Sequence, residues 1–204
     1  MPTADARSSI LDCACQLFAE GGFAGTSMRA LAKAAQTSQA LIHHHFGTKR
    51  GLYQAVRQSL VERLALADLI DTPLDTADED PTDHIAASMA RYAAFLQQNP
   101  EYLKLVSWAR LEGDDEPWAE PHQILEPLAD ALHALQDVGA LRPDLDVGLH
   151  MALVGGIVEH WVANAAVMTR TFAPDLDVEA ATNRFFAQTA SVIAHGALPR
   201  TETP

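Results

Sequence analysis

The chain has 204 residues, of which 48% are hydrophobic and 20% charged, a composition typical of folded domains and not of disordered chains. Only two cysteines, Cys13 and Cys15, are present, which excludes a disulfide-stabilised scaffold and fits a reducing compartment. The formal net charge of -13 at pH 7 argues at first sight against a nucleic-acid partner. The first residues show no signal-peptide pattern, so we expect a cytoplasmic protein.

The charge is unevenly distributed along the chain. Residues 1–60 contain six lysines and arginines against three acidic residues, a local charge of +3, whereas residues 61–204 contain eight basic and 24 acidic residues, a local charge of -16. The basic N-terminal part can therefore face phosphate groups, while the acidic remainder must face something else.

The sequence predicts an all-α fold, because good helix formers are frequent and no segment shows the sustained alternation of a strand. Glycines at 21 and 22 are expected to end the first helix, and hydroxyl residues are placed to cap the next three. About nine helices are expected, over residues 4–20, 28–35, 39–45, 48 to about 66, 83–99, 101–111, 122–138, 145–171 and 178–195.

Two acidic, proline-containing stretches, residues 71–82 and 113–121, are expected to be loops. The longest apolar stretch covers residues 149–168 and contains Glu159 and His160. Because charged groups are costly at bilayer depth, we predict that this stretch does not span a membrane.

The first 47 residues have the spacing of a helix-turn-helix. The helices predicted over residues 28–35 and 39–45 are joined by only three residues, which suits the crossing angle of this motif. The second of these helices would enter the major groove with its first residues against base edges. Gln39 can bond adenine in bidentate fashion, and Ala40 can meet a thymine methyl group.

Other polar side chains in this region suit the phosphate backbone. The ammonium group of Lys49 can meet a phosphate oxygen. Helix N-termini favour anions, and three hydroxyl residues lie at such ends: Ser27, Thr37 and Ser38.

Three consecutive histidines, His43, His44 and His45, follow on the third helix. Neighbouring residues of a helix point about 100° apart, so the three cannot chelate one ion, and neither a metal nor a cofactor is predicted. We interpret the three as DNA contacts, with a solvated surface as the alternative. The cysteines are interpreted as small packing residues, because no activating group for a redox switch lies nearby in the sequence.

Three blocks of residues follow one another with consistent gaps: 17–23 (LFAEGGF), 26–35 (TSMRALAKAA) and 38–49 (SQALIHHHFGTK). Over residues 7–56 this order resembles the TetR family of bacterial transcriptional repressors, and residues 139–146 resemble the usual lead-in to the family's eighth helix. The resemblance implies a helix-turn-helix DNA-binding domain over residues 1–50. It also implies a larger helical ligand-binding and dimerisation domain over residues 51–204.

The resemblance further implies roles for individual residues. Positions near the DNA backbone are Ser27, Met28 and Arg29. Base-reading positions are Gln39, Ala40 and His43, and phosphate-contacting positions are His45 and Lys49. Two departures stand out. Gln36 occupies a turn position where glycine is common, so the turn is expected to differ in detail. Histidines replace the common tyrosines at 43 and 45, where charge can vary with pH.

The C-terminal part supplies candidate ligand residues. Pockets between helices are mostly apolar with a few polar groups. Glu159 and His160 interrupt an apolar helix, and an inward polar group needs a partner, which is either another side chain or a ligand. The candidates for an inducer cavity, each of which can instead be ordinary core, are Met89, Tyr92, Phe95, Trp108, Leu125, His160 and Trp161.

The helix predicted over residues 145–171 is apolar over much of its circumference, so it needs more than one partner. Gly155 and Gly156 allow another backbone to approach closely. Together with the helix over residues 178–195, it is expected to form a dimer interface of four helices, two from each protomer. Packing within one chain is the alternative.

These features predict a homodimeric transcriptional repressor that a small-molecule inducer releases from a palindromic double-stranded DNA operator. A transcriptional activator of the same fold is an alternative. A metal-dependent enzyme is disfavoured, because the sequence has no Gly-x-Ser-x-Gly, His-Glu-x-x-His or Gly-x-Gly-x-x-Gly motif. A helical interaction protein that does not bind DNA is disfavoured by the basic N-terminal part.

Overall fold

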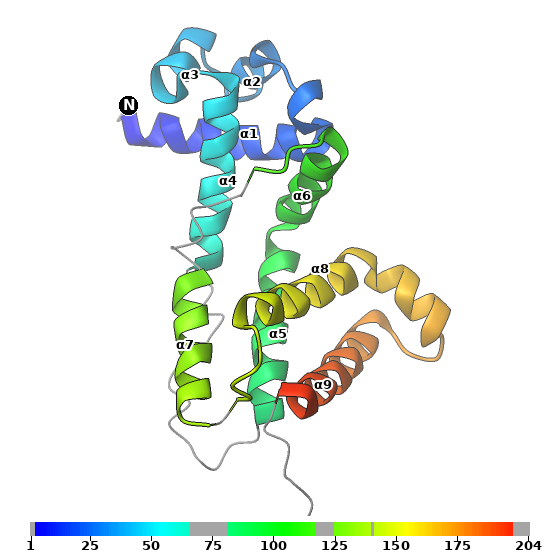
Figure 1. Ribbon diagram of the computed structural model, residues 1–204. Coiled ribbons are helices and arrows are strands. Elements are labelled where there is room, and N and C mark those ends of the chain that lie inside the picture. Colours follow the sequence, from blue (N-terminus) through cyan, green and yellow to red (C-terminus); the bar gives the residue numbers. More distant parts are fainter. Residues whose placement is uncertain (1–2, 66–80, 117–124, 140, 198–204) are drawn as a thin grey trace, which may run out of the picture. The chain divides into compact units, whose positions relative to one another are not determined.

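A computed structural model describes residues 3–65, 81–116, 125–139 and 141–197 (Figure 1). Within these ranges all regular secondary structure is α-helical, which confirms the predicted fold class. The helices are α1 (Thr3–Gly25), α2 (Met28–Ala34), α3 (Gln39–Phe46), α4 (Lys49–Ala65), α5 (Pro81–Gln98), α6 (Pro100–Glu112), α7 (Leu125–Asp137), α8 (Val147–Phe172) and α9 (Val178–Ala197).

The predicted end of the first helix at Gly21 and Gly22 coincides with a break in α1: Gly22 has a non-helical backbone conformation, and a short further segment of α1 follows it to Gly25. One predicted boundary is wrong. Pro81 starts α5 instead of lying in a loop, because proline suits the first turn of a helix, where its missing N–H has no partner to lose. The remainder of that predicted loop, residues 71–80, and residues 117–121 of the second loop lie outside the described residues.

The chain divides into two compact units. The first consists of residues 1–63 and 99–120, and the second of residues 64–98 and 121–204. The first unit therefore contains nearly all of α4 and the whole of α6 in addition to the three N-terminal helices. It extends beyond the predicted DNA-binding domain of residues 1–50, whose boundary was drawn by function and stays a prediction.

In the first unit, α1 packs against α6 and α2, and α2 packs against α3. Apolar side chains from these helices and from α4 form one core, in which the Phe18 and Tyr53 rings meet edge to face at 5.0 Å. Burial raises the pKa of Tyr53 and keeps its hydroxyl group neutral. The fully buried large side chains of this core are Ile10, Phe18, Leu31, Ile42, Leu52, Tyr53, Val56, Leu60 and Leu105.

The two cysteines lie on α1 and are both unbridged. Cys15 is buried, and its burial raises the pKa of the thiol to about 11, so the reactive thiolate is scarce at neutral pH. Cys13 is half-buried and its Sγ approaches the Ala34 carbonyl oxygen at 3.6 Å. The positions of both side chains agree with the interpretation that the cysteines are small packing residues.

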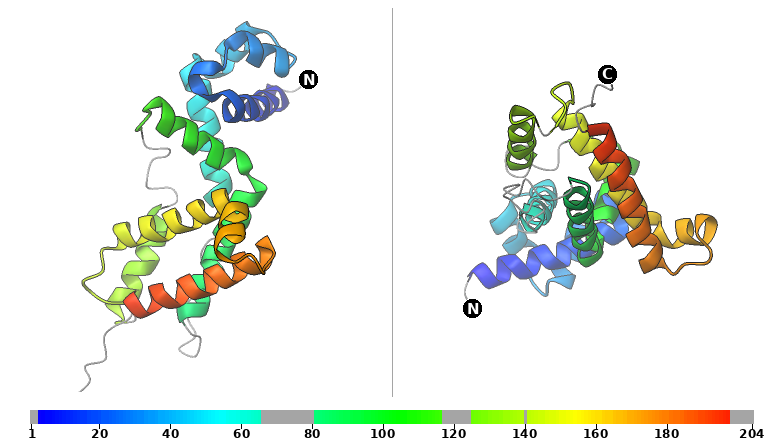
Figure 2. Two further views of the ribbon diagram at one scale, coloured as in Figure 1. Left: turned by 90° about the vertical axis from the view of Figure 1, so that its right-hand side faces the viewer. Right: turned by 90° about the horizontal axis from the view of Figure 1, so that it is seen from below.

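In the second unit, α5 packs against both α8 and α9, and α7 packs against α8. The two last helices lie beside each other (Figure 2). Between them the rings of Trp161 and Phe185 stack at a centroid distance of 4.0 Å, and Trp161 Nε1 donates to Thr182 Oγ1 at 3.0 Å. The Trp161 side chain is therefore a structural link between α8 and α9.

The connection from α7 to α8 is held by specific polar contacts. Gln136 Nε2 donates to the carbonyl oxygens of Arg142 and Leu145, at 2.8 and 2.9 Å. Asp146 caps α8 by accepting from the Leu149 N–H at 2.9 Å. The Arg142 guanidinium bonds Asp144 and also donates to the Gly196 carbonyl oxygen near the end of α9. The segment thereby ties α8 to both of its neighbours.

The break in α1 at Gly22 brings α1 and α6 into close contact. Gly22 has φ 69° and ψ -179°, a conformation that is essentially restricted to glycine. The Trp108 indole lies directly against it, and Trp108 Nε1 donates to the Ala19 carbonyl oxygen at 3.2 Å. The buried Thr26 hydroxyl donates to the Gly22 carbonyl oxygen at 2.8 Å, which turns the chain toward α2.

We predict that Gly22→Ala lowers the free energy of unfolding by about 2–4 kcal/mol, because the backbone conformation excludes a side chain and overpacking adds to the cost. An added Cβ would lie only 2.8 Å from the Trp108 ring. Gly25→Ala is the matched control, since its Cβ would have no neighbour within 4 Å, and a change below about 0.5 kcal/mol is expected. Urea denaturation at one protein concentration measures both, and equal losses would contradict the prediction.

Candidate DNA-binding site

Two serine caps begin the helices of the helix-turn-helix. Ser27 Oγ accepts from the Ala30 N–H, and Ser38 Oγ accepts from the Leu41 N–H, each at 3.1 Å. Each cap satisfies a backbone donor that the first turn of its helix leaves free. Both helix starts lie where the sequence predicted them, at residues 28 and 39.

The turn between α2 and α3 keeps a left-handed conformation although it has no glycine. Gln36 has φ 49°, and it is the only non-glycine residue with positive φ among the described residues. A side chain in this region costs about 1–2 kcal/mol. The Thr37 N–H donates to the Ala32 carbonyl oxygen at 2.9 Å, which holds the turn. Gln36 therefore has the left-handed conformation that glycine adopts at less cost.

The third helix has one buried face and one exposed face. Ile42 is fully buried and anchors α3 in the core of the first unit. Gln39, Ala40, His43 and His44 are all exposed. The predicted base-reading residues thus share the exposed side of α3, while its buried side is anchored in the core. A helix that inserts into the major groove needs this arrangement.

The three histidines have different surroundings. His43 Nδ1 lies 2.6 Å from the Gly47 carbonyl oxygen, and its ring is exposed. His44 is exposed. His45 is half-buried, and its Nε2 is buried without a hydrogen-bond partner among the described residues. Its phosphate contact stays a prediction, and in this conformation Nε2 does not face solvent. No group of three or more metal-ligating side chains occurs in the described ranges.

Lys49 opens α4 beside an aromatic ring. Thr48 caps this helix by accepting from the Gly51 N–H at 3.0 Å. Lys49 Nζ lies 4.4 Å from the centroid of Phe23, so the ring attracts the ammonium group and limits its freedom. A cation that is already oriented loses less entropy when it meets a phosphate group.

The remaining predicted backbone contacts differ in exposure. Ser27 and Arg29 are exposed at the start of α2, and Ser38 is exposed at the start of α3. Met28 is half-buried and packs against the core, and Thr37 is half-buried in the turn. The structure therefore brings all the predicted DNA contacts of α2 and α3 into one motif, although Met28 also serves the core.

Two family models match the chain. The model described as bacterial regulatory proteins, tetR family, matches residues 10–56, and the model described as tetracyclin repressor-like, C-terminal domain, matches residues 85–191. The chain belongs to the tetR family of bacterial regulatory proteins. This family is one of transcriptional regulators and not a class of enzymes.

Relatives and solved structures agree with the membership. The chain is 25% identical to the "Probable acrEF/envCD operon repressor" of Escherichia coli K12, over 78% of this chain and 77% of the relative. It is 39% identical to the HTH-type transcriptional repressor Rv3405c of Mycobacterium tuberculosis, over 37% of this chain and 45% of the relative. SCO4942 of Streptomyces coelicolor has the same fold, with a TM-score of 0.71 at 23% identity over 96% of this chain and 99% of that one.

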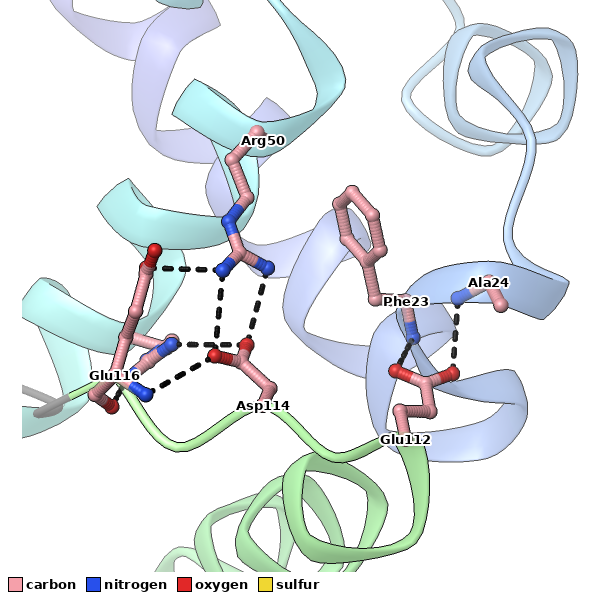
Figure 3. Close-up of polar contacts among 7 residues, drawn as sticks. Phe23, Ala24, Arg50, Glu112, Asp114 and Glu116 are labelled. Carbon is pink, nitrogen blue, oxygen red and sulfur yellow. Dashed lines mark hydrogen bonds and ion pairs between the residues drawn. The ribbon is translucent and has the colours of Figure 1, made fainter.

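Sequence reasoning missed an ion cluster in this tetR-family regulator (Figure 3). Arg50 donates to both Asp114 carboxylate oxygens, at 3.0 and 3.2 Å, and Arg57 Nη1 donates to Asp114 Oδ2 at 3.2 Å. Only 3% of the Arg57 side chain and 9% of the Asp114 side chain are exposed. Arg57 Nη2 also donates to the Glu116 carbonyl oxygen, and Arg50 pairs with the Glu116 carboxylate at 2.9 Å.

The electrostatics of the cluster favour the charged forms. Slight burial of Arg50 opposes its charge, but its hydrogen bonds and its proximity to Asp114 and Glu116 outweigh that cost and raise the pKa of the guanidinium group. The bidentate Arg50–Asp114 geometry is the stronger form of such a pair. The cluster fixes the first half of α4 to the segment that follows α6.

Glu112, at the end of α6, holds the break in α1. Its two carboxylate oxygens accept from the backbone N–H groups of Phe23 and Ala24, at 3.1 and 2.9 Å (Figure 3). Phe23 is also the ring that attracts Lys49. Residues 112–116, which we call the acidic clasp, therefore contact both the end of α1 and the start of α4.

The predicted ligand residues are distributed over both units. Met89 and Phe95 are buried on α5, and Tyr92 between them donates to Glu159 Oε1 on α8 at 2.6 Å. The inward Glu159 thus finds a side-chain partner. His160 is exposed on α8 and does not share the buried position of its neighbour Trp161. The side chain of Leu125, another predicted ligand residue, lies outside the described part of the structure.

Trp108 belongs to the first unit, whereas the other predicted ligand residues belong to the second. Its indole is engaged by Ala19 and Gly22 of α1. The sequence grouped it with the C-terminal residues because periodicity does not show that α6 packs on α1. The contacts of Trp108 that the described residues show are with α1, and its role in a ligand cavity stays a prediction.

We predict that Asp114→Asn lowers the free energy of unfolding by about 3 kcal/mol, because it leaves the buried Arg57 guanidinium without its carboxylate. Asp144→Asn is the matched control: it removes a carboxylate from an ion pair with Arg142 in which 66% of the Asp144 side chain is exposed. The control is expected to lose less than about 1 kcal/mol. Urea denaturation compares the variants, and a loss at Asp114 no larger than at Asp144 would refute the buried cluster.

Proposed function

We propose that this protein is a homodimeric transcriptional repressor that binds a palindromic operator and is released by a small-molecule ligand. The supporting observation is the exposed outer face of α3, with Gln39, Ala40 and His43 presented above the buried anchor Ile42. The repressors among its relatives favour repression over activation as the outcome of DNA binding. Such a bacterial regulator acts in the cytoplasm.

In this proposal α3 enters the major groove and the basic residues around it meet phosphate groups. Gln39 and His43 face base edges, while Ser27, Arg29 and Lys49 contact the backbone. Of the basic residues near the motif, Arg50 and Arg57 form ion pairs with the acidic clasp. We therefore assign the phosphate contacts to the basic residues that have no carboxylate partner in the described ranges, and to Lys49 first among them.

The outer face of α8 supports a homodimer. A stripe of exposed residues at helical spacing contains only one polar side chain, and its members are Leu149, Ala152, Leu153, Gly156, His160, Ala163 and Val167. Leu149 is 71% exposed and Leu153 54%. A large exposed apolar patch on a folded chain marks an interaction site, and small residues within it let a second helix approach closely. A second copy of α8 and α9 would cover this face as a four-helix interface.

By length and composition, α8 could also cross a membrane, and only 11% of its most apolar window is buried within one chain. Core helices of soluble proteins pass the same test. Other faces of α8 hold Glu159 in a bond with Tyr92 and Trp161 in a stack with Phe185. The exposed stripe lies between these two engaged positions, and we propose that the dimer partner covers it.

Ligand release would use the acidic clasp. Met89, Phe95 and Trp161 supply apolar surface in the second unit, and the Tyr92–Glu159 pair supplies polar groups there. A ligand that favours one arrangement of α5 would act on α6, since only Asn99 separates the two helices in the chain. The clasp at the end of α6 would pass the change to Lys49, and the ligand would select dimers whose reading helices no longer match the operator spacing.

We predict that the purified dimer binds duplex DNA from around its own gene and that the affinity falls steeply with salt. Lys49→Ala is expected to weaken binding and to reduce the slope of log affinity against log salt by about 2, one phosphate contact from each protomer. Fluorescence anisotropy across a salt series gives this slope. Lys104→Ala, an exposed lysine on α6, is the control and is expected to leave the slope unchanged. An equal slope for wild type and Lys49→Ala would remove Lys49 from the interface.

We also predict that Leu153→Asp is monomeric at concentrations where the unaltered chain is a dimer. The substitution would bury one carboxylate from each protomer in the dimer interface, and an unpaired buried charge is costly. Val138→Asp is the control: Val138 is 77% exposed but follows α7, outside the proposed interface. Light scattering after size-exclusion chromatography measures the mass. A monomeric unaltered chain, or a dimeric Leu153→Asp variant, would contradict the proposed interface.

A further inference from the structure

One hydrogen bond defines the protonation of His43. Its Nδ1 lies 2.6 Å from the carbonyl oxygen of Gly47, one turn further along. A carbonyl oxygen can only accept, so Nδ1 must carry the hydrogen and donate it. A neutral imidazole carries one ring hydrogen, so Nε2 is then a bare acceptor.

The same contact limits how the ring can turn. The Gly47 N–H donates to the His43 carbonyl oxygen at 2.9 Å, while the Gly47 carbonyl oxygen accepts from the His43 ring. Gly47 has φ 71°, which ends α3 and turns this carbonyl back toward the helix. The ring is thus bonded to its own helix end, and Nε2, on the opposite edge of the ring, is left for another partner.

We propose that His43 is a specificity-determining residue that reads an amino group in the major groove through Nε2. The proposal rests on the proposed operator binding by α3. The only hydrogen-bond donors on the major-groove edges of the bases are the N4 amino group of cytosine and the N6 amino group of adenine. A pure acceptor therefore selects cytosine or adenine over guanine or thymine on the strand that it contacts.

Gln39 does not by itself discriminate between bases with an amino group and bases with a keto group in the major groove. Its side-chain amide offers both a donor and an acceptor, so it has a partner on every base edge. His43 in its Nδ1–H form offers only the acceptor. At one position of each half-site we therefore expect adenine or cytosine to bind more tightly than guanine or thymine, by about fivefold to tenfold, the lower end of the usual cost of one mismatched base pair.

The test begins with selection of binding sites from a randomised duplex library by the full-length dimer at pH 8. Affinities are then measured for duplexes that differ at each position of the selected site. The expected profile has one position per half-site at which amino bases are preferred over keto bases. His43→Gln should reduce this preference to less than about twofold, and His43→Lys, which can only donate, should reverse it in favour of guanine.

His133→Gln is the matched control, since it removes an exposed histidine of α7 outside the helix-turn-helix, and it should keep the preference.

The outcomes separate the inference from the function on which it rests. Failure to select any duplex sequence would refute the proposed operator binding. A selected site whose base preferences are the same for the unaltered dimer and His43→Gln would refute the role of His43 and leave operator binding in place. A preference that disappears in His133→Gln would also overturn it.

Discussion

The DNA-binding part of this protein depends on one buried carboxylate. Asp114 lies between two guanidinium groups, one of them almost completely buried, and a charge in such surroundings is stable only while its partner is present. The two ion pairs of Asp114 therefore hold the first half of α4 against the segment that follows α6. Two residues earlier, Glu112 binds the backbone where α1 is broken. Residues 112–116, at and just after the end of α6, therefore contact both helices that flank α2 and α3.

The acidic clasp also reduces the positive charge that the N-terminal residues offer to DNA. Arg50 and Arg57 belong to the basic N-terminal residues but are neutralised by carboxylates from residues 112–116. Counting charges along the sequence therefore overstates the charge that the motif offers to DNA. Lys49 and Arg50 both lie over the Phe23 ring, but of these two only Arg50 pairs with carboxylates among the described residues, and a ring orients a cation without cancelling its charge.

The sequence predicted those features that depend on neighbours in the chain. The starts of α2 and α3 followed from Ser27 and Ser38, because a cap acts on a backbone group three residues away. The acidic clasp could not be predicted, since Arg50 and Asp114 are 64 positions apart and nothing local pairs them. The contacts of Trp108 with Ala19 and Gly22 could not be predicted for the same reason. Gln36 shows the reverse case, in which the fold imposes a backbone conformation that the local residue disfavours.

The helix α8 shows why periodicity alone could not assign the C-terminal candidates. His160 and Trp161 are neighbours, and a helix separates their directions by about 100°, so at most one of them can face a given partner. Both sides of this helix are apolar, and the sequence therefore does not show which side is covered within the chain. Trp161 is the covered one, through Phe185 and Thr182, while His160 lies on the exposed stripe with Leu153. The broad apolar surface that obscured the pattern is thus the sum of two faces, one covered within the chain and one exposed face that we propose a second copy covers.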